Sequence, residues 1–242
     1  VVLLYLGLDE ISESEGLDRS NMKLPQSQVN LLEAVAAVNE KVVIVMSAGS
    51  AVEMPWLSKC KAMVHGYLCG QAGASAVLKV LLGEVNPSGK LPFVWAKEEK
   101  DLPEICWDTE YQYYGYYHGY AKLDREAVSP TFPFGFGLSY TSFVYSDFSV
   151  SDKTLGEDGE IKVSIRVVNV GKRRGSQVIQ LYLHEHACAL KRPEKELRDF
   201  VKLEIAPGVN INIERMAISQ VITAEQKLEK AVKKIEKKSK KT

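Results

Sequence analysis

The chain has 242 residues, enough for one large domain or two domains of ordinary size. Basic and acidic side chains both number 31, so net charge does not favour a nucleic-acid or anionic-membrane partner. No apolar run reaches the roughly 18 residues that a transmembrane helix needs. Four cysteines are too sparse for a disulfide framework, and they slightly favour a reducing, cytoplasmic compartment; the localisation is otherwise unknown.

The first part of the chain alternates apolar strand patterns with helical patterns. In chain order we expect a strand at Val1–Gly7, a helix within 26–40, a strand at Lys41–Ser47, a short helical stretch at Val52–Ser58, a strand at Ala62–Leu68 and a helix at Gly70–Gly83. The strands are apolar throughout, as in parallel sheets that helices cover on both faces. This order predicts a parallel α/β sheet. Because Val1–Gly7 opens the chain as a buried strand, we also expect further sequence upstream.

The middle of the chain lacks a sustained period. Asn86–Gly89 predicts a turn, and Tyr111–Tyr120 packs many aromatic residues into ten positions. Such a segment is too apolar for a solvated linker. We expect it to cross a domain interface or line a cleft, where packing between domains is favoured over stacking on sugar rings.

Beyond Phe143 the hydrophobic period becomes two. Strand patterns cover 143–151, 160–170, 176–186, 197–208 and 209–219, with turn signals between them, and predict an antiparallel β-sandwich. The division should fall near Tyr140–Phe143. Residues 220–242 form a lysine-rich tail with a capping box at Thr223–Gln226, which predicts a solvated helix rather than a tether for acidic partners.

The loop after the first strand is crowded with carboxylates: Asp9, Glu10, Glu13, Glu15 and Asp18. Ligands of α/β sheets bind at the carboxyl ends of the strands, where this loop should lie. Mutual repulsion favours the protonated form of a carboxyl in such a group, as general acid catalysis requires. Taken alone, an acidic loop more often forms solvated surface, and the residues by themselves do not select one carboxylate.

Four segments in order resemble family 3 of the glycoside hydrolases, the β-glucosidase and β-xylosidase family. They are SEGLDRSNMKLPQSQ, GQAGASAVLKVLLGEVNPSGKLP, FPFGFGLSYTSF and RPEKELRDFVKLEIAPG. The resemblance implies an incomplete (α/β)6-type sandwich domain over 1–142, a fibronectin type III-like domain over 143–219, and the tail over 220–242.

The resemblance also implies functional residues. The family's acid/base glutamate lies in a motif of the form E-G-x-D-R, which places it at Glu15. Asp18, Arg19 and His118 are candidate substrate-binding residues. The family's nucleophile is an aspartate on a TIM-like barrel, and no aspartate of this chain matches that motif. We therefore expect a missing barrel as partner, on either side of this segment.

The leading interpretation is part of a retaining, exo-acting β-glycosidase that hydrolyses terminal non-reducing β-D-glycosyl residues. Glu15 would supply the acid/base carboxyl, and the chain alone should be close to inactive, because retention needs two facing carboxyls. The expected partner is a β-linked glycoside, with no cofactor, metal, nucleic acid or membrane. The alternatives are a non-catalytic carbohydrate-binding or interaction module, or a truncated gene product. The sugar itself is not specified by these residues.

Overall fold

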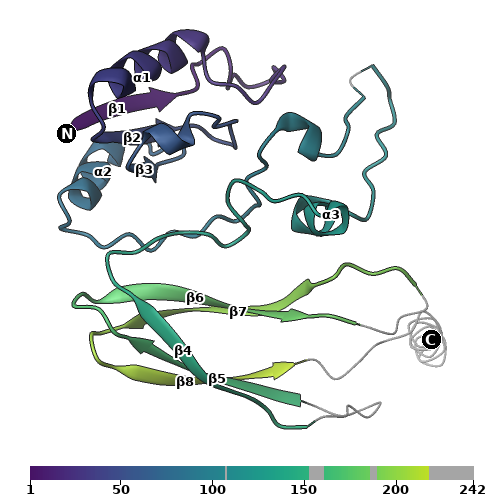
Figure 1. The fold of residues 1–242 in the computed structure, drawn as a ribbon. Helices are drawn as coiled ribbons and strands as arrows, with labels where there is room; N and C mark the ends of the chain where they lie inside the picture. The colour runs from purple at the N-terminus through teal and green to yellow at the C-terminus, as the bar shows by residue number, and fades with distance from the viewer. Residues whose placement is uncertain (107, 153–160, 186–189, 218–242) are drawn as a thin grey trace, which may run out of the picture.

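The computed structural model describes residues 1–106, 108–152, 161–185 and 190–217 (Figure 1). A three-stranded parallel sheet occupies the first part of the chain, and two antiparallel sheets occupy the last part. The expected fold class, parallel α/β followed by a β-sandwich, is confirmed. No helix in the described ranges is long and apolar enough to cross a membrane. The predicted helix in the tail lies outside these ranges.

The parallel sheet has the order β1-β2-β3. Its elements are β1 at Val2–Gly7, α1 at Gln26–Val38, β2 at Val42–Ser47, a 3₁₀ helix at Leu57–Lys59, β3 at Ala62–His65 and α2 at Gly73–Leu81. The central strand β2 is almost wholly buried, as its apolar sequence predicts. The edge strand β1 is buried on one face only: Leu4 and Leu6 join Leu32 of α1 in the core, whereas Leu3 and Tyr5 are exposed.

Three predicted element bounds were too long. In place of the helical stretch expected at 52–58, the structure has a short 3₁₀ helix at Leu57–Lys59. The third strand ends at His65, because Tyr67 takes a left-handed conformation with φ of 53°. Helix α2 begins at Gly73, since Gly70 upstream also has a positive φ, of 64°. Left-handed backbone ends regular strands and helices alike.

The connection from the parallel sheet to the β-sandwich contains a helix that the sequence pattern does not reveal. This helix is α3 at Gly119–Glu126, and a 3₁₀ turn at Glu99–Asp101 precedes it. Trp95 fixes the connection to the first core: its Nε1 donates to the carbonyl of Val52 at 2.7 Å, and its backbone pairs with Phe132. The aromatic segment contacts the β-sandwich, since the hydroxyl of Tyr120 accepts from the backbone N–H of Leu197 at 3.1 Å.

The second part is a sandwich of two sheets, β4-β5-β8 and β6-β7. The strands are β4 at Phe143–Val150, β5 at Ile161–Asn169, β6 at Gly175–Leu183, β7 at Glu196–Ile205 and β8 at Asn210–Ala217, close to the period-two patterns. Its fully packed core is small and centres on Val167, Ile205 and Ile213.

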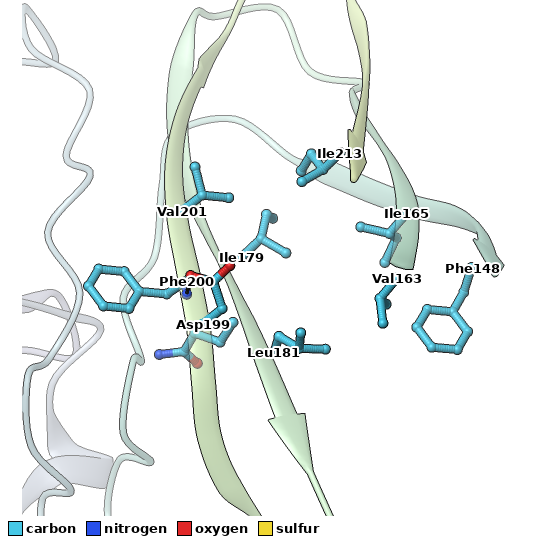
Figure 2. A pocket seen from close by; sticks show the side chains of 10 residues that line it. Phe148, Val163, Ile165, Ile179, Leu181, Asp199, Phe200, Val201 and Ile213 are labelled. Carbon is cyan, nitrogen blue, oxygen red and sulfur yellow. Dashed lines mark hydrogen bonds between the residues drawn. The ribbon is translucent and has the colours of Figure 1, made fainter. Parts of the chain in front are cut away.

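The two sheets of the sandwich separate enough to leave a narrow gap of about 70 Å³ (Figure 2). Ile179 and Leu181 of β6 face Val163 and Ile165 of β5 across it, while the ring of Phe200 points away. The gap is far smaller than the roughly 300 Å³ at which ligand pockets begin. It belongs to the hydrophobic core of the sandwich and does not favour a carbohydrate site there.

Candidate active site

The acidic loop lies where β1 and β2 both end. Because the three strands are parallel, their carboxyl ends share one edge of the sheet, which is the edge that binds ligands in such folds. The side chain of Gln28 fixes the start of the loop: its Oε1 accepts from the backbone N–H of Gly7 at 2.9 Å, and its Nε2 donates to the Gly7 carbonyl at 2.8 Å. The loop therefore leaves the sheet in a defined direction.

Two of the acidic side chains have structural partners. Asp9 accepts from the backbone N–H of Ser12 at 2.8 Å, and these hydrogen bonds from Ser12 lower the pKa of Asp9. Glu13 accepts from the backbone N–H of Gly49 at 2.7 Å, which joins the loop to the segment after β2. Each of these two carboxylates therefore helps to hold the loop conformation.

Glu15 differs from both. Its side chain is exposed, and no described residue gives it a hydrogen bond or an ion pair. Gly16 follows with φ of 78°, and a Cβ built on it would meet nothing within 4 Å. The loop thus presents Glu15 to open space beside a residue that leaves room for close approach of a ligand.

Arg19 is half-buried at the end of the same loop. Its Nη1 donates to the hydroxyl of Ser50 at 2.5 Å and to the carbonyl of Ala51 at 3.4 Å. Its Nη2 is buried, with no hydrogen-bond partner among the described residues. Burial lowers the pKa of the guanidinium, and the carboxylates of Glu13 and Glu99 oppose that shift. The guanidinium nevertheless keeps its charge at neutral pH, because the ordinary pKa of arginine lies far above neutrality.

A cleft of about 1240 Å³ opens beside Arg19. Arg19 and Ser50 line it from the acidic-loop side, and the aromatic segment lines it with Tyr114, Tyr116 and His118. The structure thus brings Arg19 and His118 to one cleft, whereas Glu15 and Asp18 are exposed and are not among its lining residues. The prediction that the aromatic segment lines a cleft is correct.

Sequence reasoning missed part of this cleft. Phe93 lines it from the connection, and Pro193 and Glu196 line it from the β-sandwich. Glu196 lies within the conspicuous RPEKELRDF segment, but nothing in that segment indicates contact with a tyrosine far upstream. Only the docking of the two parts brings them together.

Other titratable candidates have structural roles. His65 packs against Tyr67 and Trp95 at ring-centroid distances of 4.1 and 5.0 Å, and burial lowers its pKa to about 4. Both of its ring nitrogens are buried, and no described residue gives either of them a hydrogen bond. In the described part of the chain, no three His, Cys, Asp or Glu side chains gather as a metal site would require.

Comparison with known proteins gives a consistent match. A model described as the glycosyl hydrolase family 3 C-terminal domain matches residues 1–140, and a fibronectin type III-like model matches residues 177–228. Thermostable beta-glucosidase B of Acetivibrio thermocellus is 43% identical over 213 residues, and a beta-glucosidase of Bacteroides ovatus is 41% identical over 212. The chain spans only 28% of the length of each relative, while 86% and 84% of the chain is covered.

Solved structures agree with the sequence relatives. The beta-glucosidase of Bifidobacterium adolescentis superimposes with a TM-score of 0.84 at 35% identity, covering 90% of this chain and 33% of that one. The beta-glucosidase of Kluyveromyces marxianus, solved in complex with glucose, gives a TM-score of 0.80 at 36% identity, covering 89% of this chain and 26% of that one.

Proposed function

The chain belongs to glycoside hydrolase family 3, and we propose that it is the acid/base-bearing portion of a retaining β-glycosidase that acts on terminal β-D-glucosyl residues. The observation that carries this proposal is the state of Glu15. It is the carboxyl of the E-G-x-D-R motif, its loop follows β1 at the edge of the sheet where such folds bind ligands, and no residue that the structure describes is its partner.

The retaining mechanism explains why this part of the enzyme requires the barrel domain. In retaining hydrolysis two carboxyls face each other at about 5–5.5 Å: one attacks the anomeric carbon, and the other protonates the leaving oxygen and then deprotonates water. Glu15 supplies the second role. The family's barrel supplies the nucleophile, so this chain alone should be close to inactive: general acid catalysis contributes only about 10²–10⁴-fold.

Arg19 and His118 are proposed as substrate-binding residues because both line the cleft. The unpartnered Nη2 of Arg19 is a charged donor suited to a sugar hydroxyl. Asp18 is exposed and precedes Arg19 in the chain, and we propose it as a further acceptor for a substrate hydroxyl. No observation favours a cofactor.

The test restores a family 3 barrel by fusing it to this chain or mixing the two. Glu15→Ala should slow hydrolysis of alkyl and oligosaccharide β-glucosides by about 10²–10⁴-fold, because their leaving groups need protonation. Aryl glucosides with good leaving groups should be much less affected in the glycosylation step. Azide should rescue the second step, since this anion attacks without a general base.

Glu10→Ala is the matched control, because Glu10 is another exposed carboxylate of the same loop. It should leave all of these rates nearly unchanged. Equal slowing of good and poor leaving groups by Glu15→Ala, without azide rescue, would assign the acid/base role to another residue.

A further inference from the structure

The β-sandwich contributes to the cleft through one specific contact. The hydroxyl of Tyr116, in the aromatic segment, donates to Oε1 of Glu196 at the start of β7 at 3.1 Å. Both residues line the cleft. Tyr116 remains 60% exposed although the ring of Tyr117 packs against its ring at 5.4 Å, so its hydroxyl is held while part of the side chain stays accessible.

Glu196 is itself firmly held. The guanidinium of Arg192 donates to both of its carboxylate oxygens, at 3.0 to 3.3 Å, and Arg198 donates to it as well. Hydrogen bonds from Arg192 keep the pKa of Glu196 below its usual value. Glu196 is therefore an ionised acceptor at neutral pH, and bidentate pairing fixes its orientation.

The chain following Tyr116 is anchored to the same strand. The hydroxyl of Tyr120 accepts from the backbone N–H of Leu197 at 3.1 Å, and Lys195 pairs with Asp124 of α3 at 2.8 Å. The aromatic segment is thus fastened to the start of β7 on both sides of His118. A loosely held loop would leave the ring of Tyr116 without a defined position.

The cleft chemistry fits a saccharide of more than one unit. A pyranose ring has C–H faces that pack on aromatic rings and a rim of hydroxyls that need polar partners. Tyr116 supplies an aromatic face, while Arg19 and Glu104 supply charged hydrogen-bonding groups in the same cleft. The volume exceeds the upper end of ordinary small-ligand pockets, about 1,000 Å³.

We propose that the β-sandwich takes part in substrate recognition: Glu196 positions Tyr116 as a platform for a glucosyl unit on the leaving-group side of the scissile bond. This inference rests on the proposed function for the choice of sugar and of side. Tyr116 is the contact residue and Glu196 is a positioning residue. The sandwich thereby biases the enzyme towards β-linked oligosaccharides over glycosides with small leaving groups.

The first experiment titrates this chain with cellotriose by calorimetry or NMR. Tyr116→Ala should weaken binding about five- to tenfold, the order expected for losing one aromatic contact. Glu196→Ala should weaken it about two- to fivefold by releasing the ring, and Glu196→Gln, which keeps an acceptor, should restore most of the affinity. Tyr111→Ala is the control, since Tyr111 is 85% exposed and does not line the cleft.

The second experiment uses the chain restored with its barrel. Tyr116→Ala and Glu196→Ala should raise KM for cellotriose and leave KM for methyl β-glucoside unchanged, with little effect on kcat. Equal KM changes for both substrates, unchanged cellotriose binding by Tyr116→Ala, or no millimolar binding by the unaltered chain would overturn the inference. Binding does not depend on proton transfer, so a Glu15→Ala variant with full activity would refute the acid/base assignment while leaving this platform standing.

Discussion

The carboxylate of Glu13 accepts a hydrogen bond from the backbone N–H of Gly49 at 2.7 Å, so the loop after β1 is tied to the segment after β2. This contact distinguishes two neighbouring glutamates that the sequence alone leaves equivalent in chemistry. Glu13 holds the loop, and Glu15, two residues later, has no partner among the residues that the structure describes.

Weakening the hydrogen bond between Gly49 and Glu13 should lower activity by displacing the loop that carries Glu15, and not by removing a group that transfers a proton. A Cβ at Gly49 would lie 3.0 Å from Oε1 of Glu13, so Gly49→Ala should displace that carboxylate. We expect about 1 kcal/mol lower stability and a several-fold lower kcat/KM in the enzyme restored with its barrel. The loss should be similar for good and poor leaving groups. A loss confined to poor leaving groups would instead implicate Glu13 in catalysis.

Asn86 should control how firmly the two parts are joined. Its Nδ2 donates to the Arg174 carbonyl at 2.9 Å, and its Oδ1 accepts from the Ser139 hydroxyl at 3.0 Å and the Tyr140 N–H at 2.8 Å. Asn86→Ala should cost about 1–3 kcal/mol in urea unfolding, because several groups lose a partner together. It should also speed proteolysis near Tyr140.

The matched control for that variant is Asn30→Ala. Asn30 is an exposed asparagine on α1 whose side-chain oxygen accepts a hydrogen bond from Gln26 at 2.9 Å, within the same helix. Its replacement should change unfolding by less than about 0.5 kcal/mol. Equal effects of the two substitutions would show that Asn86 does not join the parts.

His65 should make stability depend on pH. Burial lowers its pKa from 6.5 to about 4, so between these values the unfolded chain binds a proton that the folded chain does not. The stabilisation is present above pH 6.5 and is lost as pH falls through about 4. Solvent screening of this partly exposed ring reduces its contribution to about 1 kcal/mol. As pH falls from 6.5 towards 4, the urea midpoint of the unaltered chain should fall relative to that of His65→Phe, which has no imidazole to protonate; parallel curves would contradict the assignment.

The exposed face of β1 should bind apolar probes. Leu3 and Tyr5 are 46% and 68% exposed on the face opposite Leu4 and Leu6, and among the described strands β1 pairs only with β2. An uncovered strand edge with an apolar face favours aggregation. We expect the isolated chain to bind a dye for apolar surface, and Leu3→Ser with Tyr5→Ser to reduce that signal and increase solubility.

Tyr113→Ser serves as the control, because Tyr113 is 88% exposed on the aromatic segment, away from this sheet. It should change dye binding much less. A cooperative monomer without dye binding would show that the β1 face is covered in solution.

Local pattern was sufficient for most of the secondary structure. Apolar runs predicted the parallel strands, because a strand buried on both faces is apolar at every position. Alternation of apolar and polar residues predicted the sandwich strands, because only one face of such a strand is buried. Family resemblance through the E-G-x-D-R motif selects Glu15 as the proposed acid/base residue. Helix α3 escaped this reasoning because its sequence is polar, and because Tyr120 and Asp124 hold it against β7.

The cleft depends on contacts between residues far apart in the chain, which local sequence patterns do not predict. Arg19, His118 and Glu196 are far apart in the chain and come together only when the aromatic segment docks on the start of β7. The hydrogen bond from Gly49 to Glu13 is equally non-local, and it separates Glu13, which holds the loop, from Glu15, for which the described residues provide no partner. Hydrophobic periodicity determines which face of an element is buried, but the pairing of polar groups between elements is decided by tertiary packing.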